Sequence, residues 1–243
     1  MKIEIWSDYT CPFCYIGKRN LETALRDFSG KDQVEVEFKS YQLDPNAEKY
    51  TGQDFYESMA AKFGGVERAK QMTAGIAEQA KEVGLTFHFD TMKPTNTFDA
   101  HRLNKYACQQ GKDQEIAEKL LQANFTDSED VGNLETLANI AEDVGLDKTE
   151  ALETLQDETA FRDDVNTDLH EAQQFGITSV PFFLINRKYA ISGAQPVETF
   201  TQALEKVLEE EQPKPVFQDL SGESATDAAC AEGSCANPNT TDS

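Results

Sequence analysis

Long apolar runs are missing from this sequence of 243 residues. No stretch approaches the run of about 18 apolar residues that predicts a membrane-spanning helix, so we expect no membrane partner. The chain begins directly with a predicted strand, without a basic segment or an apolar signal core before it. These absences predict a cytoplasmic protein.

Basic residues are also scarce. Lys and Arg number 22 against 44 Asp and Glu, which gives a formal net charge of -22. An anionic surface repels the phosphate backbones of nucleic acids, so we expect no nucleic-acid partner. High solubility or a salty habitat explains the charge, and steering of cationic partners is the alternative.

Cysteine is sparse, and most other catalytic patterns are missing. Five cysteines are too few for a disulfide scaffold in a chain of this length. His88, His101 and His170 share no metal-ligand spacing and are expected to be structural, and Cys108 falls on a predicted helix stripe and is expected in the core. A Gly-rich phosphate loop, a catalytic triad and a pair of catalytic carboxylates are not recognisable. We therefore predict no cofactor and no metal site.

Cys11 and Cys14 lie where a short apolar strand, Ile3 to Ser7, meets a helix. The free N–H groups and the positive dipole end at a helix start favour a thiolate there. A second cysteine one turn away can form and break a disulfide with the first. We therefore predict Cys11 as an exposed nucleophile and Cys14 as a buried resolving thiol. Half of a zinc site, or two inert core cysteines, are the alternatives.

The segments around this pair predict an α/β fold. The helix after the cysteines carries an apolar stripe that ends near Gly30, and residues 34–38 then alternate as in a strand with one buried face. Strand, helix and strand indicate a βαβ unit. Near the other end of the chain, two apolar runs separated by Asn186-Arg187 predict a β-hairpin, followed by a helix that begins at Gln195-Pro196.

Residues 53–175, between these segments, show almost no strand signal. Helical spacing recurs there in seven stretches: 53–63, 65–83, 97–109, 113–124, 133–143, 148–156 and 158–175. We therefore predict a sheet domain of residues 1–45 and 176–212, interrupted by an all-helical domain of residues 46–175. Residues 213–243 are rich in small and polar residues and are expected to form a flexible tail.

Three stretches together resemble a known family: residues 7–17, which read SDYTCPFCYIG, residues 180–183, VPFF, and residues 189–195, YAISGAQ. Over residues 1–211 the chain is similar to the DsbA-family thioredoxin-fold oxidoreductases, and within them to the FrnE-like cytoplasmic branch. The resemblance implies an α/β thioredoxin fold with a large inserted all-helical domain. It also implies a protein disulfide oxidoreductase or isomerase in which Cys11 attacks, Cys14 resolves and a cis Pro181 lies beside them. An ordinary trans proline at an edge strand is the alternative for Pro181.

The resemblance also suggests how substrates bind. Pro12, Phe13 and Val180 are the expected substrate-binding residues, and the expected partners are protein thiols and disulfides, with glutathione or a thioredoxin-type reductant as further candidates. Periplasmic members carry His where this chain has Phe13, so we expect weaker thiolate stabilisation and milder oxidising power. Asp8 is a candidate proton acceptor, although a solvated loop aspartate is the preferred interpretation.

A second pair, Cys230 and Cys235, lies in the predicted tail, where Gly233 lets the intervening loop close. We interpret it as an auxiliary redox pair that exchanges disulfides with the first pair; metal binding or no role are the alternatives. Two other functions stay open. One is a glutathione-using isomerase or transferase of the kappa-like branch, which usually has Ser in place of the cysteine pair. The other is a zinc-binding or redox-sensing protein that is not an enzyme.

Overall fold

The computed structural model describes residues 1–211, of which Met1–Glu210 form one compact unit. The predicted flexible tail, with Cys230 and Cys235, lies outside the described residues. Among the helices of residues 1–211, none combines the length and the apolar character needed to cross a membrane. The predicted boundaries at residues 45 and 175 stay a prediction.

A four-stranded mixed sheet forms the centre of this unit, in the order β2-β1-β3-β4. Its strands are β1 (Lys2–Ser7), β2 (Glu35–Ser40), β3 (Phe182–Ile185) and β4 (Tyr189–Ser192). β1 pairs with β2 in parallel and with β3 in antiparallel register, and β3 and β4 are antiparallel. The expected α/β class, βαβ unit and hairpin are confirmed.

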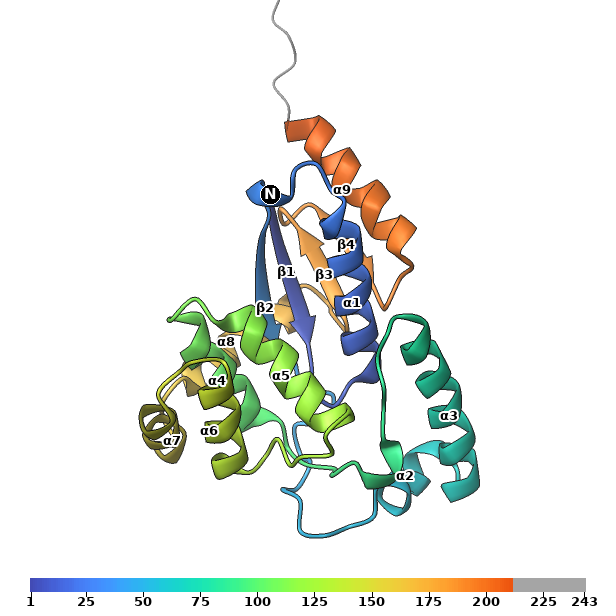
Figure 1. Ribbon diagram of the computed structural model, residues 1–243, viewed down its shortest axis with the longest axis vertical. Helices are drawn as coiled ribbons and strands as arrows, with labels where there is room; N and C mark the ends of the chain where they lie inside the picture. Colours follow the sequence, from blue (N-terminus) through green and yellow to red (C-terminus); the bar gives the residue numbers. More distant parts are fainter. Residues whose placement is uncertain (212–243) are drawn as a thin grey trace, which may run out of the picture. The chain divides into compact units, whose positions relative to one another are not determined.

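Two helices run alongside the strands, α1 (Pro12–Arg26) and α9 (Val197–Glu211) (Figure 1). One face of β1 contributes Ile3 and Ile5 to a core that also contains Leu204 of α9. Phe183 of β3 and Phe200 of α9 meet edge to face, with ring centroids 4.8 Å apart. Burial of this face fixes α1, and with it the cysteine pair, against the sheet.

The remaining helices gather around the end of the sheet where β1 leads into α1 (Figure 1). They are α2 (Phe55–Phe63), α3 (Val66–Glu82), α4 (Phe98–Cys108), α5 (Asp113–Phe125), α6 (Leu134–Asp143), α7 (Lys148–Gln156) and α8 (Arg162–Gln174), with short 3-10 turns at Lys31–Gln33 and Phe89–Thr91. Asp54, Asn133 and Asp147 cap α2, α6 and α7 through their side chains. The helical prediction is confirmed, except that α8 begins after a turn at Phe161, whose φ of 57° interrupts the helix.

The β3–β4 turn places Asn186 and Arg187 at positive φ, 50° and 53°. Arg is an unusual residue for such a turn. Its guanidinium group forms two hydrogen bonds with the buried Glu4, at 2.8 and 2.6 Å, and an ion pair with Glu171 at 2.8 Å. These long-range contacts favour Arg at a position where local backbone preference does not.

Part of the second face of the sheet is covered as well, whereas the alternation of residues 34–38 predicts one buried face. Trp6 of β1 packs in an apolar cluster with Ala172 of α8, and its indole N–H donates to the Asp168 carbonyl at 3.1 Å. Lys39 of β2 is mostly buried and forms ion pairs with Glu37 at 2.7 Å and with Asp168 at 3.4 Å. Glu37 and Lys39 alternate with apolar residues on β2 because they face this ionic cluster, whereas Glu35 is exposed.

Candidate functional site

The cysteine pair lies at the start of α1. Cys11 is the N-cap residue and Pro12 follows at the first helical position, where a missing N–H costs nothing. The Cys11 N–H donates to the Asp8 carbonyl at 3.1 Å, and the Cys14 N–H donates to the Cys11 carbonyl at 3.0 Å. The first turn of α1 contains no acidic residue. The helix start therefore offers the Cys11 sulfur a positive environment.

Cys11 is more buried than expected. Its exposed fraction is 4%, and that of Cys14 is 2%, because both pack in the apolar cluster of Trp6 and Val180. The prediction of an exposed Cys11 is therefore wrong, while that of a buried Cys14 is confirmed. Phe13, at 37%, is the exposed side chain of the motif.

The Val180–Pro181 bond is cis, as expected. The Cys11 thiol donates a hydrogen bond to the Val180 carbonyl, with 3.5 Å between Sγ and oxygen. The Pro181 carbonyl in turn accepts from the Gly193 N–H at 2.8 Å, which ties this loop to the end of β4. The fold thus brings together Pro12, Phe13 and the cysteines with residues about 170 positions later in the chain.

Gly17 is a site residue that the sequence patterns did not reveal. A Cβ atom at this position would lie 3.0 Å from Pro181 Cγ, 3.2 Å from Phe183 Cζ and 3.4 Å from Ala194 Cα. The absence of a side chain is what allows α1 to approach the proline loop. A glycine inside a predicted helix, one turn after a redox motif, is the signal that could have found it.

Gly17→Ala is expected to destabilise the protein by about 1–3 kcal/mol, because the new methyl group meets a rigid proline ring and backbone. It should also slow disulfide exchange, since the loop that carries Val180 must move away from Cys11. Chemical denaturation and a disulfide-exchange assay measure the two effects.

Gly75→Ala is the matched control, because a Cβ there, in the middle of α3, meets nothing within 4 Å. It should be stabilising by about 0.5–1 kcal/mol through helix propensity. Equal behaviour of the two variants would show that close approach at Gly17 is unimportant.

Burial dominates the protonation of Cys14. Desolvation, a hydrogen bond with Cys11 and the charge of the Cys11 sulfur raise the pKa of the Cys14 thiol well above its ordinary value. The Ser7 hydroxyl and the Asp8 N–H act in the opposite direction on this pKa. Burial therefore favours the thiol form of Cys14.

Asp8 is not a solvated loop residue, so that interpretation is wrong. Its exposed fraction is 1%, and its Oδ2 accepts a hydrogen bond from the Leu43 N–H at 2.7 Å. The loop after β2 folds over Asp8 and removes it from water. Asp8 is therefore a buried acidic residue close to the cysteine pair, since its carbonyl accepts from the Cys11 N–H.

The other singled-out residues are dispersed. His88 Nδ1 lies 2.6 Å from the Thr126 carbonyl oxygen. His170 Nε2 lies 2.9 Å from Gln174 Nε2, so the two histidines have different partners. Cys108 is exposed, so its predicted core position is wrong; the buried face of α4 carries Ala107 instead, and the next residue turns toward the surface. Across residues 1–211, no group of three His, Cys, Asp or Glu side chains is arranged to hold a metal ion.

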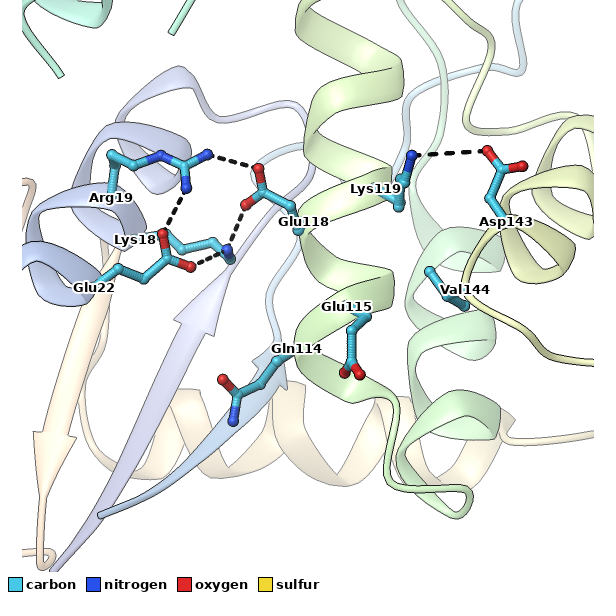
Figure 2. A pocket seen from close by; sticks show the side chains of 9 residues that line it. All are labelled: Lys18, Arg19, Glu22, Gln114, Glu115, Glu118, Lys119, Asp143 and Val144. Carbon is cyan, nitrogen blue, oxygen red and sulfur yellow. Dashed lines mark hydrogen bonds and ion pairs between the residues drawn. The ribbon is translucent and has the colours of Figure 1, made fainter. Parts of the chain in front are cut away.

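A cavity of about 790 Å³ lies between α1 and α5 (Figure 2). Most of the side chains that line it are charged, and several of them form ion pairs with one another. Glu118 accepts from Tyr15 at 2.7 Å and forms ion pairs with Lys18 and with Arg19, the latter at 2.6 Å, and Lys119 lies 3.9 Å from Asp143 on the opposite wall. The cations of α1 already have carboxylate partners, and the ion pairs of Lys18 and Arg19 with Glu118 link α1 to α5.

Comparison with known proteins agrees with this geometry. The family described as a DSBA-like thioredoxin domain matches residues 2–205. The uncharacterized protein YwbO of Bacillus subtilis (strain 168) is 29% identical over 214 residues, 87% of this chain and 98% of that protein. A probable DsbA oxidoreductase from Streptomyces coelicolor has a crystal structure with a TM-score of 0.82 and 38% identity, covering 89% of this chain and 94% of that one.

A more distant solved structure shares the fold. The cytosolic disulfide reductase DsbM from Pseudomonas aeruginosa, solved with GSH, gives a TM-score of 0.59 at 16% identity and covers 86% of this chain and 100% of that one. The predicted thioredoxin fold with a helical insertion is confirmed.

Proposed function

This chain belongs to the family of DSBA-like thioredoxin domains, whose members are thiol–disulfide oxidoreductases, and we propose that it exchanges disulfides with proteins through Cys11 and Cys14. The observation that carries the proposal is the position of Cys11. It caps α1, and its thiol faces the carbonyl of Val180 at 3.5 Å, while Cys14 lies buried one turn further along the helix. The proposed nucleophile, the proposed resolving thiol and the Val180 backbone proposed to face a substrate thus lie next to one another.

The exchange proceeds in two steps. The Cys11 thiolate attacks one sulfur of a substrate disulfide; a Cys11–substrate bond forms, and the other substrate sulfur leaves as a thiolate. The Cys14 thiolate then attacks Cys11 Sγ, forms the Cys11–Cys14 disulfide and releases the second substrate thiolate. Two electrons pass from the cysteine pair to the substrate, and the reverse sequence oxidises a substrate dithiol.

The residues around the pair suit an extended polypeptide. Phe13 is exposed beside Cys11, and Pro12 is half-buried at the start of the helix. Val180 precedes the cis peptide bond to Pro181. It lies outside the β1–β3 ladder, in which Phe182 is the first paired residue of β3. We assign substrate contact to these three residues.

Finer assignments follow from the resemblance and from relatives. Glutathione is a candidate reductant, since the disulfide reductase DsbM was solved with GSH and is cytosolic. We place this chain in the cytoplasm as well, in the FrnE-like branch, with isomerase activity on protein disulfides and Cys230 and Cys235 as an auxiliary redox pair. The paired Cys11 and Cys14 favour exchange over the kappa-like transferase chemistry.

Insulin reduction with glutathione or dithiothreitol as electron donor tests the proposal. The protein should accelerate precipitation of the insulin B chain, and its activity should be insensitive to Cys108→Ser, because Cys108 lies at the far end of α4. Metal analysis of the same preparation separates the non-enzyme alternative. Stoichiometric zinc together with no acceleration would contradict the proposed function.

A further inference from the structure

A pair of buried polar side chains lies next to the redox centre, and neither side chain forms or breaks a bond to sulfur in the two exchange steps. Asp8 Oδ1 faces His101 Nε2 at 3.6 Å, and the side chains are 1% and 2% exposed. Asp8 belongs to the loop between β1 and α1, whereas His101 belongs to α4. The pair therefore joins the cysteine loop to a helix of the predicted inserted domain.

The atoms of this pair lack hydrogen-bond partners. Among residues 1–211, four buried side-chain atoms have no hydrogen-bond partner: Ser7 Oγ, Asp8 Oδ1, His101 Nε2 and Asn124 Oδ1. Asn124 itself is fixed, since its amide donates to the Tyr9 carbonyl at 3.0 Å. Leaving a buried polar group unsatisfied costs about 1–3 kcal/mol, and a proton shared between Asp8 Oδ1 and His101 Nε2 would relieve this cost at both atoms.

Asp8 is also in direct contact with the resolving cysteine. Its N–H is a hydrogen-bond donor to Cys14, and its carbonyl accepts from the Cys11 N–H at 3.1 Å. The residue that carries the buried carboxyl group is thus in contact with Cys14 through its backbone. A carboxylate at this position opposes a second anion at Cys14.

We propose that His101 is a positioning residue for the redox centre: with Asp8 it forms a buried pair whose charge sets how readily Cys14 gives up its proton. The inference rests on the proposed function, because it concerns the second exchange step. It assigns a role in that step to a helix far from the cysteine motif in sequence.

Charge balance gives the physical reason. If the Cys14 proton left for water, the site would go from one negative charge, on Asp8, to two. If His101 is protonated as Cys14 ionises, the site holds two anions and one cation, and its net charge stays the same. In a poorly solvated interior the second route is favoured, because the positive charge on His101 would compensate the negative charge gained at Cys14.

The surrounding ionisable groups do not replace His101. The Tyr9 ring lies on the imidazole, with centroids 4.8 Å apart, and burial together with the charges of Asp8, Asp113, Cys14 and Asp168 raises the pKa of Tyr9 well above its ordinary value. Burial and Asp8 also raise the pKa of Tyr41. Lys105, one turn after His101 on α4, is ion-paired with Asp168. The His101 imidazole is thus the ionisable side chain that faces the Asp8 carboxyl group directly.

The test uses the reduced full-length protein and an aromatic disulfide whose released thiolate absorbs visible light. Stopped-flow absorbance then shows two phases: the first reports attack by Cys11 and the second reports resolution by Cys14. Loss of the first phase would contradict the proposed function, whereas the further inference concerns the second phase alone.

His101→Asn should leave the first phase unchanged, slow the second about tenfold at pH 7 and raise its pH midpoint by about one unit. Asp8→Asn keeps an acceptor for the Leu43 N–H and removes the opposing charge, so the midpoint of the second phase should move down. The exposed His170→Asn on α8 is the matched control and should change neither phase.

Opposite shifts in the two variants would support the pair and would not arise from loosened packing. An unchanged second-phase pH profile in both variants would overturn the inference, as would an upward shift in Asp8→Asn. The pH midpoint is expected to rise in His101→Asn and to fall in Asp8→Asn. If one variant folds poorly, the direction of the shift in the other still tests the inference.

Discussion

The Cys11→Ser protein is expected to lose thiol–disulfide exchange by on the order of a thousandfold or more, because serine cannot form the mixed disulfide. The fold should be kept, since a hydroxyl can also donate to the Val180 carbonyl that the Cys11 thiol contacts at 3.5 Å. Insulin reduction and thermal denaturation measure the two properties side by side.

Cys14→Ser is the informative partner variant. Attack by Cys11 remains possible, but the resolving thiol is gone, so covalent Cys11–substrate complexes should accumulate and appear on non-reducing gels. Cys108→Ser, at the exposed end of α4, is the matched control and should neither lose activity nor trap substrate. Near-normal exchange in Cys11→Ser, or trapping through another cysteine, would contradict the assignment of the nucleophile.

Asp168→Ala is expected to be the most damaging change for stability among the ionic contacts, by about 3–5 kcal/mol. The buried Asp168 carboxylate on α8 accepts from the Ser40 N–H at 2.7 Å and forms ion pairs with Lys105 and, at 3.4 Å, with Lys39. Its removal leaves two mostly buried ammonium groups and a strand-end N–H without this partner. Urea denaturation gives the change in the free energy of unfolding.

Asp164→Ala on the same helix separates charge from burial. Asp164 is exposed in the first turn of α8, where an acidic residue contributes about 0.5 kcal/mol through the helix dipole. A loss of similar size in both variants would show that the buried cluster does not tie α8 to β2. Asp168→Asn, which keeps an acceptor for Ser40, should fall between them.

Much of the secondary structure could be predicted because its causes are local. Side-chain caps at Asp54, Asn133 and Asp147 lie at the starts of helices whose apolar spacing was visible in the sequence. The start of α8 was misplaced because Phe161 adopts a left-handed conformation, which the sequence signals most clearly with a glycine, and this position is not a glycine. Cys108 was misplaced because the stripe with Leu103 and Tyr106 does not continue to it: the buried face of α4 ends at Ala107 and Cys108 is exposed.

The site divides in the same way. Cys11, Cys14 and Pro181 could be identified from motifs, since two cysteines one helical turn apart and a proline at a strand start have few other uses. Gly17 and His101 could not, because their roles come from what approaches them. A helical glycine is informative only when a proline ring lies 3.0 Å away, and a histidine only when a buried carboxylate faces it.

By itself, the sequence determined the α/β class, the helical middle segment and the hairpin, and it identified the cysteine pair for which redox chemistry is proposed, because periodicity, caps and short motifs act over a few residues. Tertiary structure alone decided that the Cys11 thiol contacts Val180, 169 positions away, and that the Glu4 carboxylate is neutralised by Arg187, 183 positions away. It also decided that Asp8 is buried and that α4 supplies its partner. Such pairings depend on which faces pack together, and burial then sets the energy of every charge placed between them.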